Sequence, residues 1–246
     1  MPAPDSTAVN AMFGRIAWRY DLANRLLSVG IDRKWRSRLV RAVRRGAPPG
    51  PVLDLATGSG DVAFALSRGL AAGTPIVGAD FCLPMLAEAE KKLAAAGPGA
   101  YPGVRFVPGD GLNLPFPDGT FAAATISFGL RNMADRPRCL AELRRVLLPG
   151  GHLFVLEFSR PRAWLRPGYY FYLRRVLPLL AGWLTRERDA YRYLNRTIEE
   201  FPGAEALTAE IRSAGFAEVE ATRLSAGIVA LHEAVKGPAG PGPASA

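Results

Sequence analysis

Between residues 52 and 158 the chain alternates short apolar runs with stretches whose apolar residues recur at helical spacing. This alternation limits the possible folds more than any other feature of the sequence. Five apolar runs have the length of a strand, at 52–56, 76–80, 105–107, 121–128 and 152–158. Helical stretches separate most of these runs, near 61–69, 84–96 and 135–148. Strand and helix repeating on this scale predict a parallel sheet with helices on both faces.

The preceding segment, residues 11–46, carries two helical patterns. Apolar residues from Phe13 to Leu27 are spaced by three and four, which predicts an amphipathic helix. A second helical pattern continues to Val43, and Asp32 stands where its N-cap would be. We expect both helices to belong to the same domain as the sheet.

The C-terminal third departs from the alternating pattern. An insertion rich in Arg and aromatic residues at 160–200 precedes a helix near 204–214 and two apolar runs at 218–224 and 228–234. Only three residues separate these runs, which predicts an antiparallel strand pair that closes the sheet. The expected fold class is α/β, with a doubly wound, seven-stranded, mostly parallel sheet of the Rossmann-like type.

The length of 246 residues suits one large α/β domain or two small ones. We expect this domain at 11–236, with residues 160–200 as a helical lid inserted into it. The tail 237–246 is rich in Gly, Pro and Ala and has nothing to bury, so it is expected to be disordered, as are residues 1–10.

The composition excludes several classes of protein. The chain has two cysteines, Cys82 and Cys139, and two histidines, His152 and His232. These numbers exclude a disulfide framework and argue against a metal centre built from Cys or His. Residues 1–10 lack the pattern of a signal peptide, and the apolar run 176–184 is too short to span a bilayer. We expect a cytoplasmic protein without a bound metal.

Positive charge is concentrated in two segments of this chain, whose formal net charge is +9. Residues 15–45 carry ten Lys or Arg against two aspartates, and residues 160–196 carry nine Arg against two acidic residues. Such segments attract phosphate-bearing surfaces, either nucleic acid or the anionic headgroups of a membrane leaflet. The alternative is that the arginines decorate solvated helix faces.

The strongest local signal is VLDLATGSGD at 52–61, the pattern of a buried strand, a glycine turn and a helix start. Gly58, Ser59 and Gly60 would let the backbone approach a ligand closely at the carboxyl end of the strand. The segment also fits the looser dinucleotide pattern G-x-G-x-x-A, and a purely structural turn is a further alternative.

Four aspartates favour S-adenosylmethionine over a nicotinamide dinucleotide. Asp80 ends the second strand, where its oxygens can accept both ribose hydroxyls of either ligand. Asp110 follows the third strand, within reach of an adenine amino group. Asp54 and Asp61 bring negative charge to the glycine turn, which repels a pyrophosphate but suits an ammonium and a sulfonium. Singly, each aspartate could be a cap or turn residue.

Four longer motifs point to one family. They are YDLANRLLS at 20–28, LPFPD at 114–118, SFGLRN at 127–132 and GIVALH at 227–232. In these motifs the chain resembles the menaquinone/ubiquinone biosynthesis C-methyltransferases, within the class I S-adenosylmethionine-dependent methyltransferases. Two positions depart from the family pattern, because Asp32 replaces a histidine and Leu148 a lysine. The first change favours a capping role for Asp32 over a catalytic one.

The resemblance implies S-adenosylmethionine as the cofactor, with contacts in the glycine loop, at the ribose, at the adenine and at the end of the fourth strand. The expected cofactor-binding residues are Asp54, Gly58, Ser59, Gly60, Asp80, Asp110, Gly111 and Ser127. Ser59 and Ser127 could instead be ordinary turn and strand-end hydroxyls.

The resemblance also implies an activity, the C-methylation of demethylmenaquinol in menaquinone biosynthesis. A ubiquinone precursor or another lipophilic phenol is the alternative substrate. A nucleic-acid methyltransferase would fit the charge, but the Asn/Asp-Pro-Pro-aromatic loop of amino-group methylators is replaced here by the sequence SFGL. A cofactor-binding module without activity would not need the aromatic insertion. We expect no nucleic-acid partner, and the oligomeric state is left open.

The insertion at 160–200 is expected to contact the substrate. Eight of the thirty residues from 164 to 193 are aromatic, against 9% of the whole chain. This enrichment suits a lid over a large apolar substrate and, with the interleaved arginines, peripheral contact with the inner face of the cell membrane. Core packing of a helix pair is the alternative.

A quinol ring carbon becomes nucleophilic when a hydroxyl proton is lost, and a free phenol titrates at about 10. A base or a cation should therefore assist. The catalytic candidates are Tyr20, Asp21 and Arg131, the last as electrostatic stabiliser of the phenolate. Arg131 could instead be a surface or capping residue, and Tyr20 a core-facing one. His232 lies on a predicted edge strand, where a structural hydrogen bond suits it better than catalysis.

Overall fold

The computed structural model describes residues 30–176 and 188–238. The predicted helix at 13–27, the terminus 1–10 and the tail beyond residue 238 lie outside the described residues. The helices are α3 (Asp32–Gly46), α4 (Asp61–Gly69), α5 (Leu83–Ala95), α6 (Arg136–Val146), α7 (Arg166–Phe171), α9 (Arg188–Glu200) and α10 (Ala204–Ser213). The strands are β1 (Val52–Leu55), β2 (Ile76–Asp80), β3 (Val104–Pro108), β4 (Phe121–Ser127), β5 (Leu147–Phe158), β6 (Phe216–Leu224) and β7 (Val229–Lys236). Short helical turns lie at Leu130–Asn132 (η2), Tyr172–Val176 (η3) and Ser225–Gly227 (η4).

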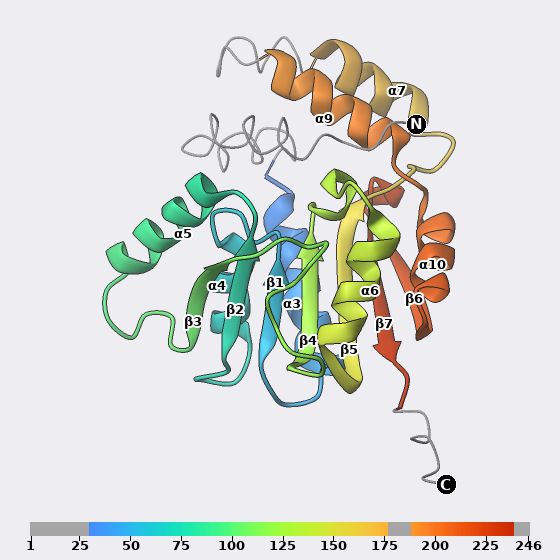
Figure 1. Ribbon diagram of the computed structural model, residues 1–246. Coiled ribbons are helices and arrows are strands. Elements are labelled where there is room, and N and C mark those ends of the chain that lie inside the picture. Colours follow the sequence, from blue (N-terminus) through green and yellow to red (C-terminus); the bar gives the residue numbers. More distant parts are fainter. Residues whose placement is uncertain (1–29, 177–187, 239–246) are drawn as a thin grey trace, which may run out of the picture.

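These strands form one seven-stranded sheet in the order β3-β2-β1-β4-β5-β7-β6 (Figure 1). β1 to β5 run parallel, β7 is antiparallel to β5, and β6 is antiparallel to β7. β1 pairs with β2 on one side and with β4 on the other. The winding therefore reverses at β1, and the carboxyl ends of β1 and β4 border the crevice where such sheets bind ligands. The predicted fold class is confirmed.

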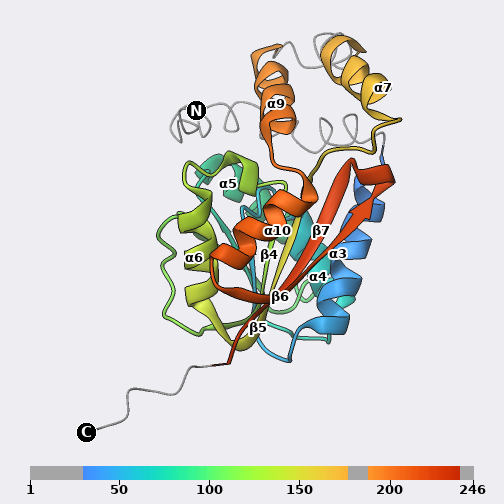
Figure 2. The ribbon, with the colours of Figure 1, turned by 90° about the vertical axis from the view of Figure 1, so that its right-hand side faces the viewer.

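Helices cover both faces of the sheet (Figure 2). α3 and α4 pack on one face, where Leu39 and Leu66 join a buried cluster with Val52. α6 packs on the other face, where Leu140 joins a cluster with Leu53. Adjacent residues of β1 thus point to opposite faces, as strand geometry requires. Because both faces are buried, the parallel strands appear in the sequence as continuous apolar runs.

The C-terminal strand pair forms as predicted, but the prediction that His232 lies on an edge strand is wrong. β7, which carries His232, lies between β5 and β6, so the edge strand is β6. The first four residues of β7 are buried, whereas most of β6 is exposed. The more apolar strand therefore takes the inner position and the charged strand the edge. His232 is buried, and its Nε2 lies 2.9 Å from the carbonyl oxygen of Ala204, a structural contact.

The start of α3 also differs from its prediction. The N-cap is Ile31, and Asp32 is the first residue inside the helix. Its carboxylate instead forms an ion pair with Arg36 one turn later. The position of Asp32 inside the helix and not at its N-cap costs little stability, because an acidic residue in the first turn still interacts favourably with the helix dipole.

The end of β4 and the start of β5 are among the strand boundaries that differ from the predicted ones. β4 ends at Ser127 because Phe128 has a left-handed φ of 55°. β5 begins at Leu147, which pairs with Phe121 ahead of a shift in register.

A cap formed by α7, η3 and α9 lies above the carboxyl ends of the strands (Figures 1 and 2). Leu173 and Ile198 form its small core, and partly buried tyrosines, among them Tyr169 and Tyr193, pack around them. The predicted insertion is thus helical on both sides of residues 177–187, which lie outside the described part. Within the described residues, no helix is long and apolar enough to cross a membrane.

Candidate active site

A cavity opens at the carboxyl ends of β1, β2 and β4, where the topology predicts a ligand. Its empty volume is about 930 Å³, counted with its open side, which is within the range of small-molecule sites. Gly58, Asp80, Asp110, Gly111 and Ser127 form part of its wall. The apolar part of the wall includes Phe81, Met85, Leu112, Phe128 and Met133. The described residues contribute two carboxylates to the lining and no Arg or Lys.

The glycine loop turns tightly between β1 and α4. Gly58 and Gly60 have φ values of 57° and 83°, in the left-handed region that favours glycine. A Cβ at Gly60 would lie 2.7 Å from the ring of Phe106, so close packing also requires glycine there. Gly58 lines the cavity, whereas Ser59 is buried and Gly60 faces the aromatic rings behind the loop.

Asp54 lies behind the loop and does not line the cavity. Its carboxylate accepts hydrogen bonds from the hydroxyls of Thr57 (2.6 Å) and Thr125 (2.7 Å). Burial raises the pKa of Asp54 to about 6, although the two hydroxyls act in the opposite direction. The carboxylate therefore ties β1 and β4 to the loop.

Asp80, the last residue of β2, presents its carboxylate to the cavity. Its Oδ2 accepts from the N–H of Gly58 at 2.7 Å, and its Oδ1 accepts from the N–H of Cys82 at 2.8 Å. Burial raises the pKa of Asp80 despite these two bonds and a further one from the backbone of Phe81. A carboxylate has about four lone-pair sites, so Asp80 keeps acceptor capacity for a ligand hydroxyl.

Asp110 and Gly111 follow β3 at the far side of the cavity. The Oδ1 of Asp110 accepts from the N–H of Leu112 at 2.9 Å, which leaves Oδ2 for a ligand donor. A Cβ at Gly111 would lie 3.1 Å from the Met133 side chain, so glycine brings this segment close to the apolar wall.

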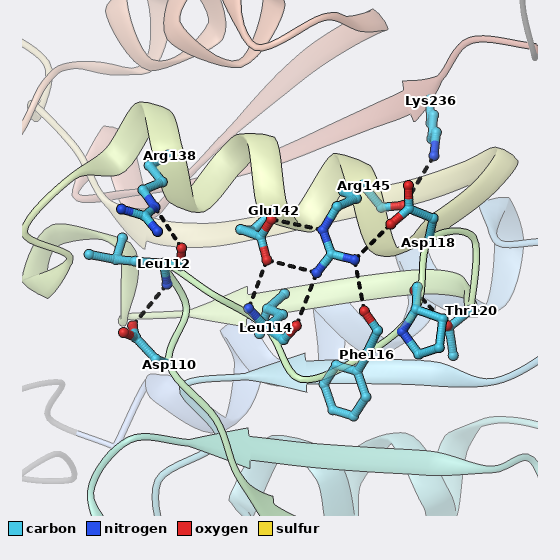
Figure 3. Close-up of polar contacts among 11 residues, drawn as sticks. Asp110, Leu112, Leu114, Phe116, Asp118, Thr120, Arg138, Glu142, Arg145 and Lys236 are labelled. Atoms are coloured by element: carbon cyan, nitrogen blue, oxygen red, sulfur yellow. Dashed lines mark hydrogen bonds and ion pairs between the residues drawn. The ribbon is translucent and has the colours of Figure 1, made fainter.

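Side chains of α6 hold the loop between β3 and β4 from outside (Figure 3). Arg138 Nε donates to the carbonyl oxygen of Leu112 at 2.7 Å. Glu142 accepts from the N–H of Leu114 at 2.7 Å, and Arg145 donates to the carbonyl oxygen of Leu114 at 3.0 Å. The segment that begins with Asp110 is therefore fixed by a helix that does not itself touch the cavity.

The chain turns sharply after Ser127, at the end of β4. A Cβ at Gly129 would lie 2.5 Å from Cβ of Ala56, so only glycine lets this turn approach the first loop. Asn132, at the end of η2, lines the cavity, and its Oδ1 accepts from the hydroxyl of Tyr193 at 3.2 Å. This bond joins the cap to the wall of the cavity.

Arg131 is buried beneath the cap rather than exposed at the surface. Its Nη1 pairs with Glu157 at 2.9 Å, and its Nε has no hydrogen-bond partner among the described residues. Burial raises the pKa of Tyr169 and of Tyr193, while the charge of Arg131 acts on both in the opposite direction. Arg131 thus faces the tyrosines of the cap and does not line the cofactor cavity.

The structure brings together five of the eight residues expected at the cofactor, whereas Asp54, Ser59 and Gly60 do not line the cavity. Tyr20 and Asp21 lie outside the described residues. The apolar wall was not predicted from the sequence. Phe81 and Leu112 directly follow Asp80 and Gly111, and this position next to expected cofactor-binding residues is the signal that the sequence contains.

Asp61 does not contribute the charge expected of it at the glycine turn. It forms ion pairs with Arg36 and with Lys92, away from the cavity lining. Among the described residues the cavity lining offers no Arg or Lys to a pyrophosphate, and its two charged side chains are the carboxylates of Asp80 and Asp110.

Carboxylates, the backbone of a glycine turn and apolar walls suit a ligand with ribose hydroxyls, an adenine amino group and a sulfonium. The fold and this donor set define a class I S-adenosylmethionine-dependent methyltransferase. The chain belongs to the ubiE/COQ5 methyltransferase family, whose model matches residues 1–236. It is a C-methyltransferase that uses S-adenosylmethionine.

Named relatives resemble the chain over nearly its whole length. The demethylmenaquinone methyltransferase of Thermus thermophilus is 50% identical over 222 residues, which cover 90% of this chain and 98% of that protein. The demethylmenaquinone methyltransferase of Parafrankia sp. is 47% identical over 95% of this chain and 94% of its own. The ubiquinone/menaquinone biosynthesis C-methyltransferase UbiE of Geobacter sulfurreducens is 41% identical over 93% and 88%.

Solved structures share the fold at lower identity. The [4+2]-cyclase SpnF matches with a TM-score of 0.68 and 20% identity, over 97% of this chain and 98% of its own. Phosphoethanolamine N-methyltransferase 2 of Haemonchus contortus, in complex with S-adenosyl-L-methionine, matches with a TM-score of 0.59 and 14% identity, over 82% and 52%.

Proposed function

We propose that this protein methylates a ring carbon of demethylmenaquinol, a lipophilic quinol with a polyprenyl tail. The observation that carries the proposal is the 50% identity to the Thermus thermophilus demethylmenaquinone methyltransferase over 98% of that protein. A ubiquinone precursor is the second candidate, because the relative from Geobacter sulfurreducens is named for both quinones. Another lipophilic phenol is a more distant alternative.

The cofactor-binding roles follow from the contacts described above. When bound, S-adenosylmethionine supplies the methyl group on its sulfonium. Asp80 accepts the two ribose hydroxyls, and Asp110 with Gly111 receives the adenine amino group. Gly58 and Ser127 contact the cofactor from the two turns. Asp54, Ser59 and Gly60 act by holding the glycine loop in place.

The substrate must be the reduced quinol. Loss of a hydroxyl proton raises the electron density on the neighbouring ring carbon, which makes that carbon a nucleophile. An oxidised quinone is electron-poor and cannot attack. Holding the ring carbon in line with the methyl group is the larger contribution expected from the protein.

Arg131 is proposed to stabilise the phenolate electrostatically. It lies beneath the cap, near Tyr169 and Tyr193, and its buried Nε has no partner among the described residues. Glu157 offsets the charge of Arg131. The stabilisation of the phenolate would therefore come from the Nε–H group of Arg131. Tyr20 and Asp21 are the proposed bases, both in the segment outside the described residues.

The cap is proposed to be a lid inserted into a single domain at 11–236, and to contact the inner face of the cell membrane from the cytoplasm. Trp164 and Phe171 are 72% and 63% exposed on the cap. Exposed aromatic residues and arginines together suit a headgroup region, from which a polyprenyl tail could enter the site.

The test is methyl incorporation from S-adenosylmethionine into demethylmenaquinol, with the ubiquinone precursor assayed in parallel. We expect turnover of demethylmenaquinol at least tenfold faster, as about 1.4 kcal/mol of discrimination would give. Faster turnover of the ubiquinone precursor would reverse the substrate assignment. Equal turnover of the oxidised quinone under strictly oxidising conditions would refute the mechanism.

A further inference from the structure

A second cavity, here called the basic groove, lies between α3 and α4. Its empty volume is about 1550 Å³, counted with its open side. Six basic side chains line it, namely Arg33, Arg36, Arg41, Arg44, Arg68 and Lys92. The groove shares no lining residue with the cofactor cavity. The proposed methyl transfer therefore gives no reason for its charge.

One end of the groove is neutralised by acidic residues. Asp61, at the start of α4, pairs with Arg36 and, at 3.0 Å, with Lys92 of α5. Asp32 pairs with Arg36 as well. Burial raises the pKa of Asp61, but the two cations outweigh burial, so the pKa is lowered and the carboxylate is charged at neutral pH. The basic residues at this end join three helices.

The other end keeps its positive charge. Arg41 and Arg44 are three residues apart on α3, about 4.5 Å along the helix axis, and Arg68 lies in the last turn of α4. The helices meet here, since a Cβ at Gly69 would lie 2.2 Å from a methyl group of Val40. Among the described residues, none of these three arginines forms an ion pair.

Arg68 is held in a fixed orientation. Its Nη1 lies 2.6 Å from the hydroxyl oxygen of Tyr101, and its guanidinium carbon lies 5.3 Å from the centre of the same ring. The other N–H groups of this guanidinium are available to an anion. Guanidinium groups bind phosphate oxygens in pairs, with a geometry that suits a tetrahedral anion.

We propose that Arg41, Arg44 and Arg68 form a binding site for a phosphate-bearing ligand. The phosphate could belong to a small molecule in solution or to the headgroup of a lipid, because both present the same anionic oxygens. The site lies on the α3 and α4 face of the sheet, so its occupation does not depend on the quinol assignment.

The experiment is calorimetric titration of the full chain with inorganic pyrophosphate at about 0.15 M salt, where long-range attraction is screened. The test variant is Arg41→Gln with Arg44→Gln. The matched control is Arg38→Gln with Arg105→Gln, which removes the same charge from exposed residues outside the groove. We expect saturable binding of pyrophosphate to the parent protein. The affinity should fall about tenfold or more in the test variant, because charge-assisted hydrogen bonds are lost. The affinity of the control variant should change by less than about threefold.

Absence of saturable binding, or an equal loss in both variants, would overturn the proposal, because the effect would then follow net charge alone. Co-sedimentation with phosphatidylglycerol and phosphatidylcholine vesicles distinguishes the two sources. A selective loss of phosphatidylglycerol binding in the test variant identifies a lipid headgroup, and pyrophosphate binding without such a loss identifies a ligand in solution. Affinity for S-adenosylhomocysteine, measured on every variant, should stay at the parental value and shows that methyl-donor binding is intact.

Discussion

Two carboxylates near the glycine loop, the buried Asp54 and the partly buried Asp80, have different roles. Asp54 accepts from two threonine hydroxyls and lies behind the loop, whereas Asp80 accepts from backbone N–H groups and lines the cavity. Burial raises the pKa of both carboxyls. Ligand hydroxyls that donate to Asp80 would offset part of the cost of its buried charge, so binding and stability should respond differently at the two positions.

Asp80→Ala should weaken the binding of S-adenosylhomocysteine by about 1.5–3 kcal/mol, because it removes charged acceptors for two ribose hydroxyls. Calorimetric titration measures the dissociation constant. Glu90→Ala is the control, since Glu90 is an exposed carboxylate outside the cavity. An unchanged dissociation constant in a folded Asp80→Ala protein would contradict the proposal that Asp80 binds the ribose hydroxyls.

Asp54 should make stability fall as the pH rises from about 4 to about 6. The carboxyl loses its proton near 3.8 in the unfolded chain and at about 6 in the folded protein. Within this window the folded state binds more protons than the unfolded state, so rising pH favours unfolding. The amide of the Asp54→Asn variant cannot ionise. In this variant the free energy of unfolding should no longer show the decrease of up to about 3 kcal/mol that Asp54 causes over this pH range. Urea denaturation at several pH values gives the two profiles, and parallel profiles would contradict the prediction.

At the scale of elements, α6 supports the cofactor site without lining it. Arg138 of α6 donates to the carbonyl oxygen of Leu112, whose N–H orients Asp110. Arg136, on the same helix, instead forms an ion pair with Glu210 of α10. The two arginines therefore offer a matched comparison between support of the loop and helix packing.

Arg138→Ala should weaken S-adenosylhomocysteine binding by about 0.5–1.5 kcal/mol, because the loop that presents Asp110 loses an outer hydrogen bond. Arg136→Ala should leave that affinity unchanged. Titration of both variants, with thermal unfolding as a check on stability, makes the comparison. Equal affinities in the two variants would mean that the loop keeps its position without Arg138.

The positions of the strands in the sequence were easier to predict than the order of the strands in the sheet or the contacts between distant residues. Buried parallel strands are continuous apolar runs, so β1, β2 and β4 could be located from the sequence to within one residue. Strand order at the C-terminal edge was missed, because it depends on the burial of β7 against β5. The ion pairs of Asp61 and the Arg138 contact join residues distant in sequence, and local spacing carries no information about them.

At the scale of the whole molecule, the cap is the proposed side of substrate entry. It lies above the carboxyl ends of the strands (Figure 2), and Tyr193 joins it to Asn132 in the cavity wall. Exposed aromatic residues near and on the cap are better probes of membrane contact than Arg174, because Arg174 is already paired with Glu199 at 2.6 Å. A charge deletion there would also change the packing of the cap.

Trp164→Ala with Phe171→Ala should weaken binding to phosphatidylglycerol vesicles, because two exposed aromatic side chains can no longer enter the headgroup region. The Michaelis constant for a long-tailed quinol should rise severalfold, whereas that for a short-tailed soluble analogue should hardly change. Leu148→Ala, at the amino end of β5 and so away from the carboxyl ends of the parallel strands, is the control for loss of an exposed apolar residue. Vesicle co-sedimentation and kinetics on both quinols measure the effects. If the double variant sediments like the parent and treats both substrates alike, the cap does not meet the membrane, and the long-tailed quinol reaches the cavity by another route.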